Sequence, residues 1–287
     1  PQLGTAVAAD PSVAFLTPSR FIVAQGETVT VHFDVGEAKT ARPATWPADR
    51  VEWLFVRGGP TQTNRHEVRA DDAQRGAVDV KIEHPGVTLV GVDQRPVALN
   101  LTGDEWRAFL RANVAESSNA VAGRLPEGSH SVRVRHVVST KTLIRAARAD
   151  GQVNSSPIAT GKSGQAVEIR PLFDPTAIRP GSDLPMRLYV LGDKCVGAQG
   201  QATHVASGHV ATFVTDREGS AYFRVTEPGL WRVEFHQATP RPGDTAADWN
   251  LYTATPMNPL TPKRPARGSA PCPPFLSGRG WGRVAAS

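Results

Sequence analysis

The chain has 287 residues, of which 40% are hydrophobic and 21% are charged, with a formal net charge of +5 at pH 7. This length allows two ordinary globular domains, and no apolar run approaches the roughly 20 residues of a membrane-spanning helix. The excess positive charge lies in residues 257–287, which hold five Lys and Arg and no acid; the rest has 27 basic and 27 acidic residues. Bulk nucleic-acid binding by the body is therefore not expected.

The sequence contains two degenerate repeats. "FIVAQGETVTVHFDVGE" (21–37) resembles "AIRPGSDLPMRLYVLGD" (177–193), and "AVDVKIEHPGVTLVGV" (77–92) resembles "AYFRVTEPGLWRVEF" (221–235). The phrases occur in the same order in both halves. Matched phrases in matched order predict two domains of one kind.

Strand patterns dominate along the chain. Alternating apolar residues occur in "ETVTVHFDV", "RVEWLFVRG", "VTLVGVD", "SVRVRHVV", "QAVEIRPL", "PMRLYVL", "AYFRV" and "LWRVEF". Gly-containing turns such as Gln25-Gly26, Pro85-Gly86, Pro180-Gly181 and Pro228-Gly229 separate them. Short strands with regular turns predict an all-β protein made of two Ig-like β-sandwich domains in tandem.

One segment has helical periodicity instead. "LTGDEWRAFLRANVAE" has Thr102 and Glu105 at capping-box spacing. Trp106, Phe109 and Leu110 then fall on one helical face. We expect a short helix over residues 103–115, packed on the first sandwich.

These patterns give three regions. The N-terminal sandwich is predicted over residues 11–150 and the C-terminal sandwich over 165–255. Between them, residues 147–165 are rich in Gly, Ser and Asn, and "GKSGQ" within them is interpreted as linker because it lacks the full phosphate-loop pattern. Residues 256–287 contain seven prolines and little periodicity, so they are expected to form an extended basic tail.

The phrases "LTPSRFIVAQGETVTVHFDVGE", "LTGDEWRAFLRANV", "PLFDPTAIRPGSDLPMRLYVLGD", "TDREGSAYFRVTEPGLWRVEFH" and "ADWNLY" resemble a bacterial exported family of unknown function, often described as similar to a nickel-transport subunit. The resemblance covers roughly residues 12–253. It implies an Ig-like sandwich architecture and a periplasmic location. Members commonly begin the mature chain with a His, which "DPSVAFLTPSRF" lacks. The start at Pro1 instead of Met is what removal of a leader or a tag would leave.

Histidines are the candidate metal ligands. His204, His209 and His236 lie in the second half, and neutral imidazoles suit Ni, Cu or Zn. His204 and His209 are five residues apart, so on one strand they would face opposite sides, although a loop could bring them together. The alternative is that all three are surface histidines, because their spacing is not diagnostic.

No catalytic constellation is evident in the sequence. Ser207 lies in "ASGHV", which is not a nucleophile elbow, and no triad can be assembled. An enzyme is therefore not expected, and no cofactor is predicted unless a transition metal binds.

The tail and the two cysteines give the remaining candidates. Cys195 and Cys272 could form one disulfide that ties the tail to the second sandwich, or remain two thiols. Aromatic and arginine side chains are good interface anchors, which makes six tail residues candidate partner contacts. They are Arg264, Arg267, Phe275, Arg279, Trp281 and Arg283. The alternative is a passive solubilising tail.

Two functions follow from these features. The first is a non-catalytic exported accessory protein, peripheral to the membrane, that docks on a membrane-associated complex through its sandwich faces and tail and contacts an anionic membrane surface. The second is a periplasmic metal-binding protein linked to uptake of nickel or a similar ion.

Overall fold

The computed structural model describes residues 14–36, 42–45, 50–59, 62–66, 75–114, 131–147 and 156–260. Strands dominate these residues, and the longest helix has 11 residues, so the predicted all-β class is confirmed. Each of the eight predicted strand segments contains a strand of the structure.

The described strands form three sheets. The first sheet contains β1 (Ala14–Pro18), β3 (Thr28–Val35), β4 (Arg42–Pro43) and β7 (Ala77–Lys81). The third contains β11 (Val167–Pro171), β12 (Asp183–Val190), β13 (Asp193–Lys194) and β16 (Ser220–Arg224). The central sheet contains β2 (Ile22–Ala24), β5 (Val51–Gly58), β6 (Gln62–His66), β8 (Gly86–Gln94), β9 (Val97–Thr102), β10 (Ser131–Ala147), β14 (Gln199–His204), β15 (Val210–Val214), β17 (Gly229–Pro240) and β18 (Trp249–Leu260).

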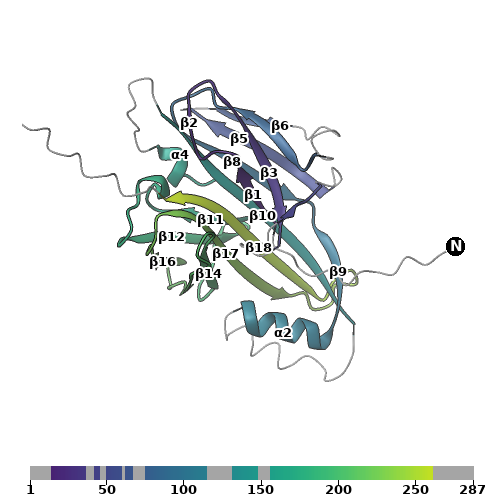
Figure 1. The fold of residues 1–287 in the computed structure, drawn as a ribbon. Helices are drawn as coiled ribbons and strands as arrows, with labels where there is room; N and C mark the ends of the chain where they lie inside the picture. The colour runs from purple at the N-terminus through teal and green to yellow at the C-terminus, as the bar shows by residue number, and fades with distance from the viewer. Residues whose placement is uncertain are drawn as a thin grey trace, which may run out of the picture.

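The central sheet joins the two halves of the chain. Its order is β15-β14-β17-β18-β10-β8-β5-β6, so strands from both halves hydrogen-bond in one layer. The junction is a parallel pair between β10 and β18, which run side by side through the middle of Figure 1. Parallel pairing needs no local turn, so no hairpin signal in the sequence points to it.

Two large apolar cores lie against this sheet. One forms between the first sheet and the β5–β8–β10 region, around Leu16, Val31, Val90 and Ile144. The other forms between the third sheet and the β14–β17–β18 region, around residues that include Leu188. Residues on both sides of the predicted boundary at 147–165 share the central sheet, and Val137 of β10 belongs to the second core.

The repeated phrases fold into equivalent structures. Gly26 and Gly181 both adopt positive φ, at 89° and 90°. Each donates its backbone N–H across the sheet, Gly26 to Ile82 and Gly181 to Val225, at 2.7 Å in both cases. The following strands, β3 and β12, also share one pattern of burial. The two segments of the first repeat therefore share one turn and strand geometry.

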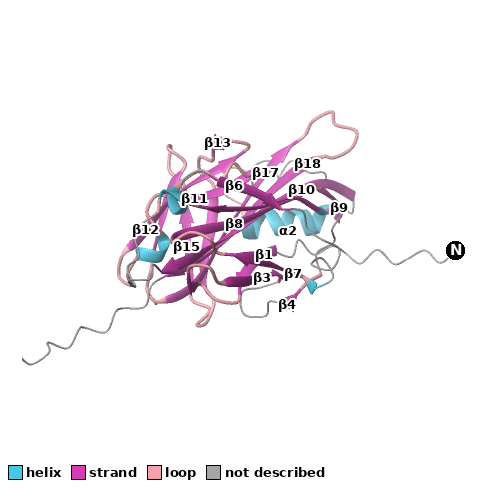
Figure 2. Ribbon diagram, turned by 90° about the horizontal axis from the view of Figure 1, so that it is seen from above, coloured by secondary structure: helices cyan, strands magenta, loops and turns pink. Residues whose placement is uncertain are grey.

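Helix α2 (Gly103–Asn113) begins at the predicted cap. The Thr102 side chain accepts from the Glu105 backbone, and the Glu105 carboxylate accepts from the Thr102 backbone at 2.7 Å. The helix lies beside β9 and β10 (Figure 2). Its buried Trp106 packs with Trp249 and Leu251 as well as with β9. The helix was predicted to pack on the first sandwich, and β17 and β18 contact it as well because they belong to the same central sheet.

Two predicted segment limits differ from the structure. Residues 156–165 are packed rather than an open linker: they form α4 (Pro157–Thr160), whose Ala159 is buried against β5 and β8, and the turn that follows it. A short 3-10 helix, η2 (Pro175–Ala177), follows β11. At the other end, residues 256–260 belong to β18 and not to the tail, because they pair with β17 as far as Leu260.

No helix within the described ranges is long and apolar enough to cross a membrane.

Candidate functional site

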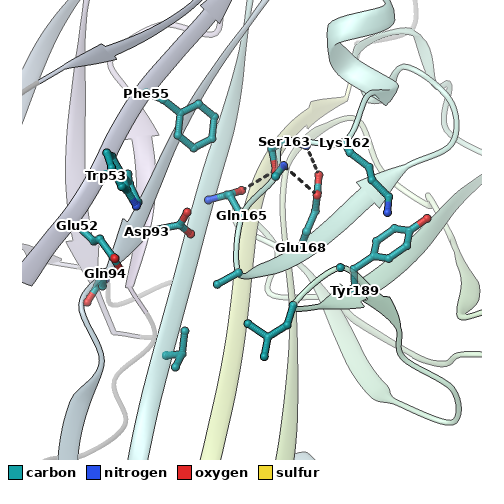
Figure 3. Close-up of a pocket in the computed structure, with 15 residues that line it drawn as sticks. Glu52, Trp53, Phe55, Asp93, Gln94, Lys162, Ser163, Gln165, Glu168 and Tyr189 are labelled. Atoms are coloured by element: carbon teal, nitrogen blue, oxygen red, sulfur yellow. Dashed lines mark hydrogen bonds between the residues drawn. The ribbon is translucent and has the colours of Figure 1, made fainter.

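A cavity of about 540 Å³ opens where the third sheet meets the central sheet. Its walls come from β5 and β8 on one side and from β12 and the turn after it on the other, with residues 162–168 between them (Figure 3). Both halves of the chain therefore build it. Its size is that of a small-molecule or peptide-side-chain pocket.

The first wall combines aromatic and acidic side chains. Leu54 and Val56 of β5 face the first core, so the alternate residues Trp53 and Phe55 face the cavity. An irregularity in β5 between Val51 and Trp53 also admits Glu52 to the lining. Trp53 lies directly opposite Asp93 of β8. This wall thus places two carboxylates beside an indole ring.

The second wall carries an aromatic ring with a cation above it, and an exposed apolar side chain. The Lys162 ammonium lies 4.1 Å from the ring centroid of Tyr189, a cation–π contact. Leu191 is 66% exposed and has a φ of 52°, the only positive φ among the described non-glycine residues. Leucine rarely adopts this left-handed conformation, and such outliers often mark functional positions.

A buried ion pair lies behind the cavity. The Lys141 ammonium is 2.9 Å from the Glu168 carboxylate, and the two side chains are only 7% and 3% exposed. Burial lowers the pKa of Lys141, and the Glu168 charge opposes that shift. Burial would by itself raise the pKa of Glu168, but the Lys141 charge and hydrogen bonds from Ser163 hold that pKa below its ordinary value. The negative charge of Glu168 is therefore already balanced by Lys141 within the protein.

Asp93 is held by hydrogen bonds, and its charge also acts on Lys141, the ammonium of which is bound to Glu168. The Ser139 hydroxyl donates to it at 2.5 Å. Burial, with help from the nearby Glu52 charge, raises the pKa of Asp93 to about 6, while hydrogen bonds from Ser139, Gln165 and the Ala166 backbone oppose the rise. Gln165 is fixed in turn, because its amide donates to the Val92 and Thr140 carbonyls at 3.1 and 3.0 Å.

The structure brings two of the three candidate metal ligands together. His204 ends β14 and His209 lies just before β15. Their ring centroids lie 5.3 and 6.0 Å, respectively, from that of Trp231. The turn between β14 and β15 places the two rings on the same side, which a single continuous strand would not do. His236 is separate from them, since it lies five residues beyond Trp231 along β17, roughly 16 Å away.

Each buried histidine already has hydrogen-bond partners. His204 places Nε2 3.1 Å from the Pro228 carbonyl and Nδ1 2.8 Å from the Ser207 hydroxyl. His236 shares the Thr253 hydroxyl with His136, at 3.0 and 2.9 Å. No group of three or more His, Cys, Asp or Glu suited to a metal occurs among the residues described. Metal binding at these positions stays a prediction.

Ser207, His204 and Glu227 form a cluster that the sequence did not indicate. Ser207 lies within hydrogen-bond distance of both His204 and Glu227. In a catalytic triad, however, the serine and the acid face different nitrogens of the imidazole. Here both face Nδ1, and Nε2 is engaged by the Pro228 carbonyl. The cluster fixes the turn between β14 and β15 and is not arranged as a triad.

The predicted partner contacts and one cysteine lie outside the described residues. All six tail side chains, from Arg264 to Arg283, fall in residues 261–287, as does Cys272. Cys195 is buried, and burial, followed by the Asp193 charge, raises the pKa of its thiol to about 12. The disulfide and the tail contacts stay predictions.

The cavity residues themselves were not predicted. Glu52, Trp53 and Asp93 lie within strands that were predicted, but no spacing in the sequence links them to Tyr189 or Leu191. The one available signal was a leucine placed before Gly192, where a tight turn usually carries Asn, Asp or Gly.

Comparisons with known proteins identify a family and little else. The DUF4198 domain of unknown function matches residues 13–239. No curated protein matches the chain. Among solved structures, murine CEACAM1b has 8% identity and a TM-score of 0.20, covering 86% of this chain and 98% of its own. Escherichia coli alpha-2-macroglobulin activated by porcine elastase has 13% identity and a TM-score of 0.17, and the match covers 85% of this chain and 22% of the macroglobulin chain. These low TM-scores support no argument about the fold or function of this chain.

Proposed function

The chain belongs to the DUF4198 family of domains of unknown function, and we propose that it is a non-catalytic binding protein that docks on a membrane-associated complex. In this proposal the cavity between the two sheets receives a group presented by that partner. The chain would act outside the cytoplasm, in the periplasm or otherwise exported, as the resemblance to an exported family implies.

The cavity with its exposed rim is the observation that carries the proposal. Trp53 is 42% exposed and Leu191 is 66% exposed, and both belong to the lining. Exposed large apolar side chains beside a concavity are typical of binding sites. A leucine held at positive φ adds to this argument, because selection for stability alone would favour Gly or Asn there.

The predicted tail and the sandwich layers would supply a second contact. The predicted Ig-like units would offer broad sheet faces, and the basic residues 261–287 would favour an acidic partner or an anionic lipid surface in a salt-dependent way. This part of the proposal rests on sequence composition.

The test is co-purification from membranes of the native host with matched variants. We expect a Trp53→Ala/Leu191→Ser variant to lose the partner that the wild-type chain retains. Tyr222→Ser is the control, because Tyr222 is equally exposed, at 67%, but lies on β16 outside the cavity. A truncation after Leu260 tests the tail. It must leave β18 intact, because Asn258 and Leu260 are buried.

The docking proposal fails if the cavity variant and the truncated chain both retain every partner at wild-type levels. Loss of the partner from the Tyr222→Ser control would also contradict it, because the contact would then lie elsewhere on the sandwich.

A metal-binding function linked to nickel uptake is the alternative. The proximity of His204 and His209 at Trp231 favours it. Titration of tag-free protein with Ni²⁺ by calorimetry, repeated with His209→Ala, tests it. One equivalent of nickel whose binding is lost in the variant would favour this alternative over docking.

A further inference from the structure

The cavity contains more acidic charge than the protein itself neutralises. Of its three carboxylates, Glu168 is paired with Lys141 at 2.9 Å. Lys162, the cationic member of the lining, has its ammonium over the Tyr189 ring on the opposite wall. Among the ion pairs of the described residues none involves Glu52 or Asp93, and the Lys141 ammonium, whose charge also acts on Asp93, is already bound to Glu168.

The two remaining carboxylates are close enough to repel each other. The Glu52 charge is one of the causes that raise the pKa of Asp93. Asp93 is held in place because the Ser139 hydroxyl donates to one of its oxygens, and Gln165 lies beside it (Figure 3). A fixed carboxylate next to a second one is a preorganised site for positive charge.

The surroundings of these carboxylates are apolar. Phe55 is buried beside them, and Trp53 and Leu191 form parts of the rim. Such walls suit the alkyl stem of a cationic side chain and strengthen charge pairing by excluding water. A dedicated calcium site takes about six to eight oxygen ligands, more than two carboxylates supply, and no group of three or more His, Cys, Asp or Glu suited to a metal occurs among the described residues.

We propose that the cavity binds an ammonium or guanidinium group, with Asp93 and Glu52 as its acceptors and the apolar rim around its alkyl stem. This rests on the proposed function and names the chemistry that a partner must present there: an exposed lysine or arginine side chain. Arg is the better fit where two acceptor oxygens face one planar group.

The test uses small probes and nitrogen-15 NMR of the full chain. The probes are N-acetyl-arginine methylamide and N-acetyl-lysine methylamide, with the citrulline and norleucine analogues as neutral controls of similar shape. The indole signal of Trp53 is assigned from a Trp53→Phe spectrum. We expect the cationic probes to shift that signal in a saturable way and the neutral probes to leave it unchanged.

Variants then locate the acceptors. Asp93→Asn should weaken the binding of the cationic probes by about tenfold or more, because a charge-assisted hydrogen bond is lost. Glu52→Gln changes an exposed side chain and provides a second variant whose folding is not at risk. Asp183→Asn is the matched control, since that carboxylate pairs with Arg224 at the surface, 3.2 Å away, and does not line the cavity.

Binding should also weaken as the pH falls from 7.5 to 5, because Asp93 is protonated below a pKa of about 6. Asp93→Asn should remove most of that dependence. Equal shifts from neutral and cationic probes would overturn the proposal, as would an affinity unchanged in both Asp93→Asn and Glu52→Gln.

The cation site and partner docking have separate readouts. If the probes bind as expected but Asp93→Asn still retains the native partner, the cation site stands and docking through it is wrong. If Ca²⁺ or Mg²⁺ alone saturates the site and the amines do not bind, the inference is wrong whatever the partner does.

Discussion

Val137 and Val138 are neighbours in β10, yet they belong to two different cores. Val137 packs with Leu188 and Phe235 in the core under the third sheet, and Val138 packs with Val90 and Ile144 in the core under the first sheet. Successive residues of a strand point to opposite faces of its sheet. The first and third sheets therefore cover opposite faces of the central sheet, and β10 serves both cores.

This arrangement predicts that the two sandwich layers unfold together. Val138→Ala should lower the free energy of unfolding by roughly 1–3 kcal/mol. Because β10 and β18 are hydrogen-bonded over nine residue pairs, the loss should be felt in both halves. Hydrogen exchange monitored residue by residue in β3 and β12 checks this. Faster exchange in β3 with β12 unaffected would mean that the cores are independent.

The sequence predicted the local elements well, for identifiable reasons. Alternating apolar residues marked β3 and β12, and the turn glycines Gly26 and Gly181 marked their starts. The capping box at Thr102 marked the start of α2. Each of these signals lies within a few residues, where propensity and periodicity act directly.

The arrangement of the halves could not be predicted in the same way. The β10–β18 pair joins residues more than 100 positions apart, and nothing local encodes a parallel partner. The cavity depends on that pairing, because it brings Tyr189 and Leu191 opposite Asp93. Residues 156–165 were interpreted as linker from their small polar composition, but Gln165 is buried by contacts with Val92 and Thr140.

The packing of Phe55 over Gly91 predicts how a substitution at Gly91 affects both stability and the cavity. The Phe55 ring occupies the space that a Cβ on Gly91 would need, and Phe213 does the same over Gly200 in the other half. Gly91→Ala should cost roughly 1–3 kcal/mol of stability through overpacking, and it should also displace Phe55 within the cavity. Gly200→Ala is the matched control, which should destabilise without changing probe binding. Urea denaturation and the NMR titration give the two readouts; unchanged binding in the Gly91 variant would contradict the predicted displacement.

The buried Lys141–Glu168 pair predicts a large asymmetry between single and double variants. Lys141→Met leaves Glu168 buried without its cation, which should cost about 3–5 kcal/mol. Lys141→Met/Glu168→Gln removes both charges and should recover a large part of that loss. Lys194→Met breaks an exposed pair with Glu218 and should change stability little, because solvent screens exposed ion pairs. Urea denaturation at pH 7 compares them, and a double variant no more stable than Lys141→Met would contradict the argument.

The two histidines that share Thr253 predict acid sensitivity. Burial lowers the pKa of His136 to about 3 and that of His236 to about 4, with smaller contributions from the neighbouring charges of His236 and Arg232 respectively. Because both folded values lie below the ordinary 6.5, the unfolded chain binds the extra protons. Their contribution to stability is therefore complete above pH 6.5 and is lost as the pH falls toward 4 and 3.

Two such groups give a slope of up to about 2.7 kcal/mol per pH unit between pH 6 and 4. His236→Leu should reduce that slope by about half. Urea denaturation at half-unit pH steps measures the slopes. If the His236 variant and the wild-type chain have the same slope, the buried imidazoles are not the groups that titrate.

Leu191 predicts a trade-off between stability and binding. Its φ of 52° is unfavourable for leucine, and a left-handed residue with a Cβ costs roughly 1–2 kcal/mol unless it is Asn or Asp. Leu191→Asn should therefore raise the free energy of unfolding by about 0.5–1 kcal/mol, since its exposed side chain adds little to any core. The same variant should weaken binding of the cationic probe, because an apolar part of the cavity rim is lost. Val196→Asn changes another exposed apolar residue, 60% exposed and without positive φ, and should alter neither quantity. If Leu191→Asn proves more stable and binds the probe as well as the wild-type chain does, the strained leucine has no role in the cavity.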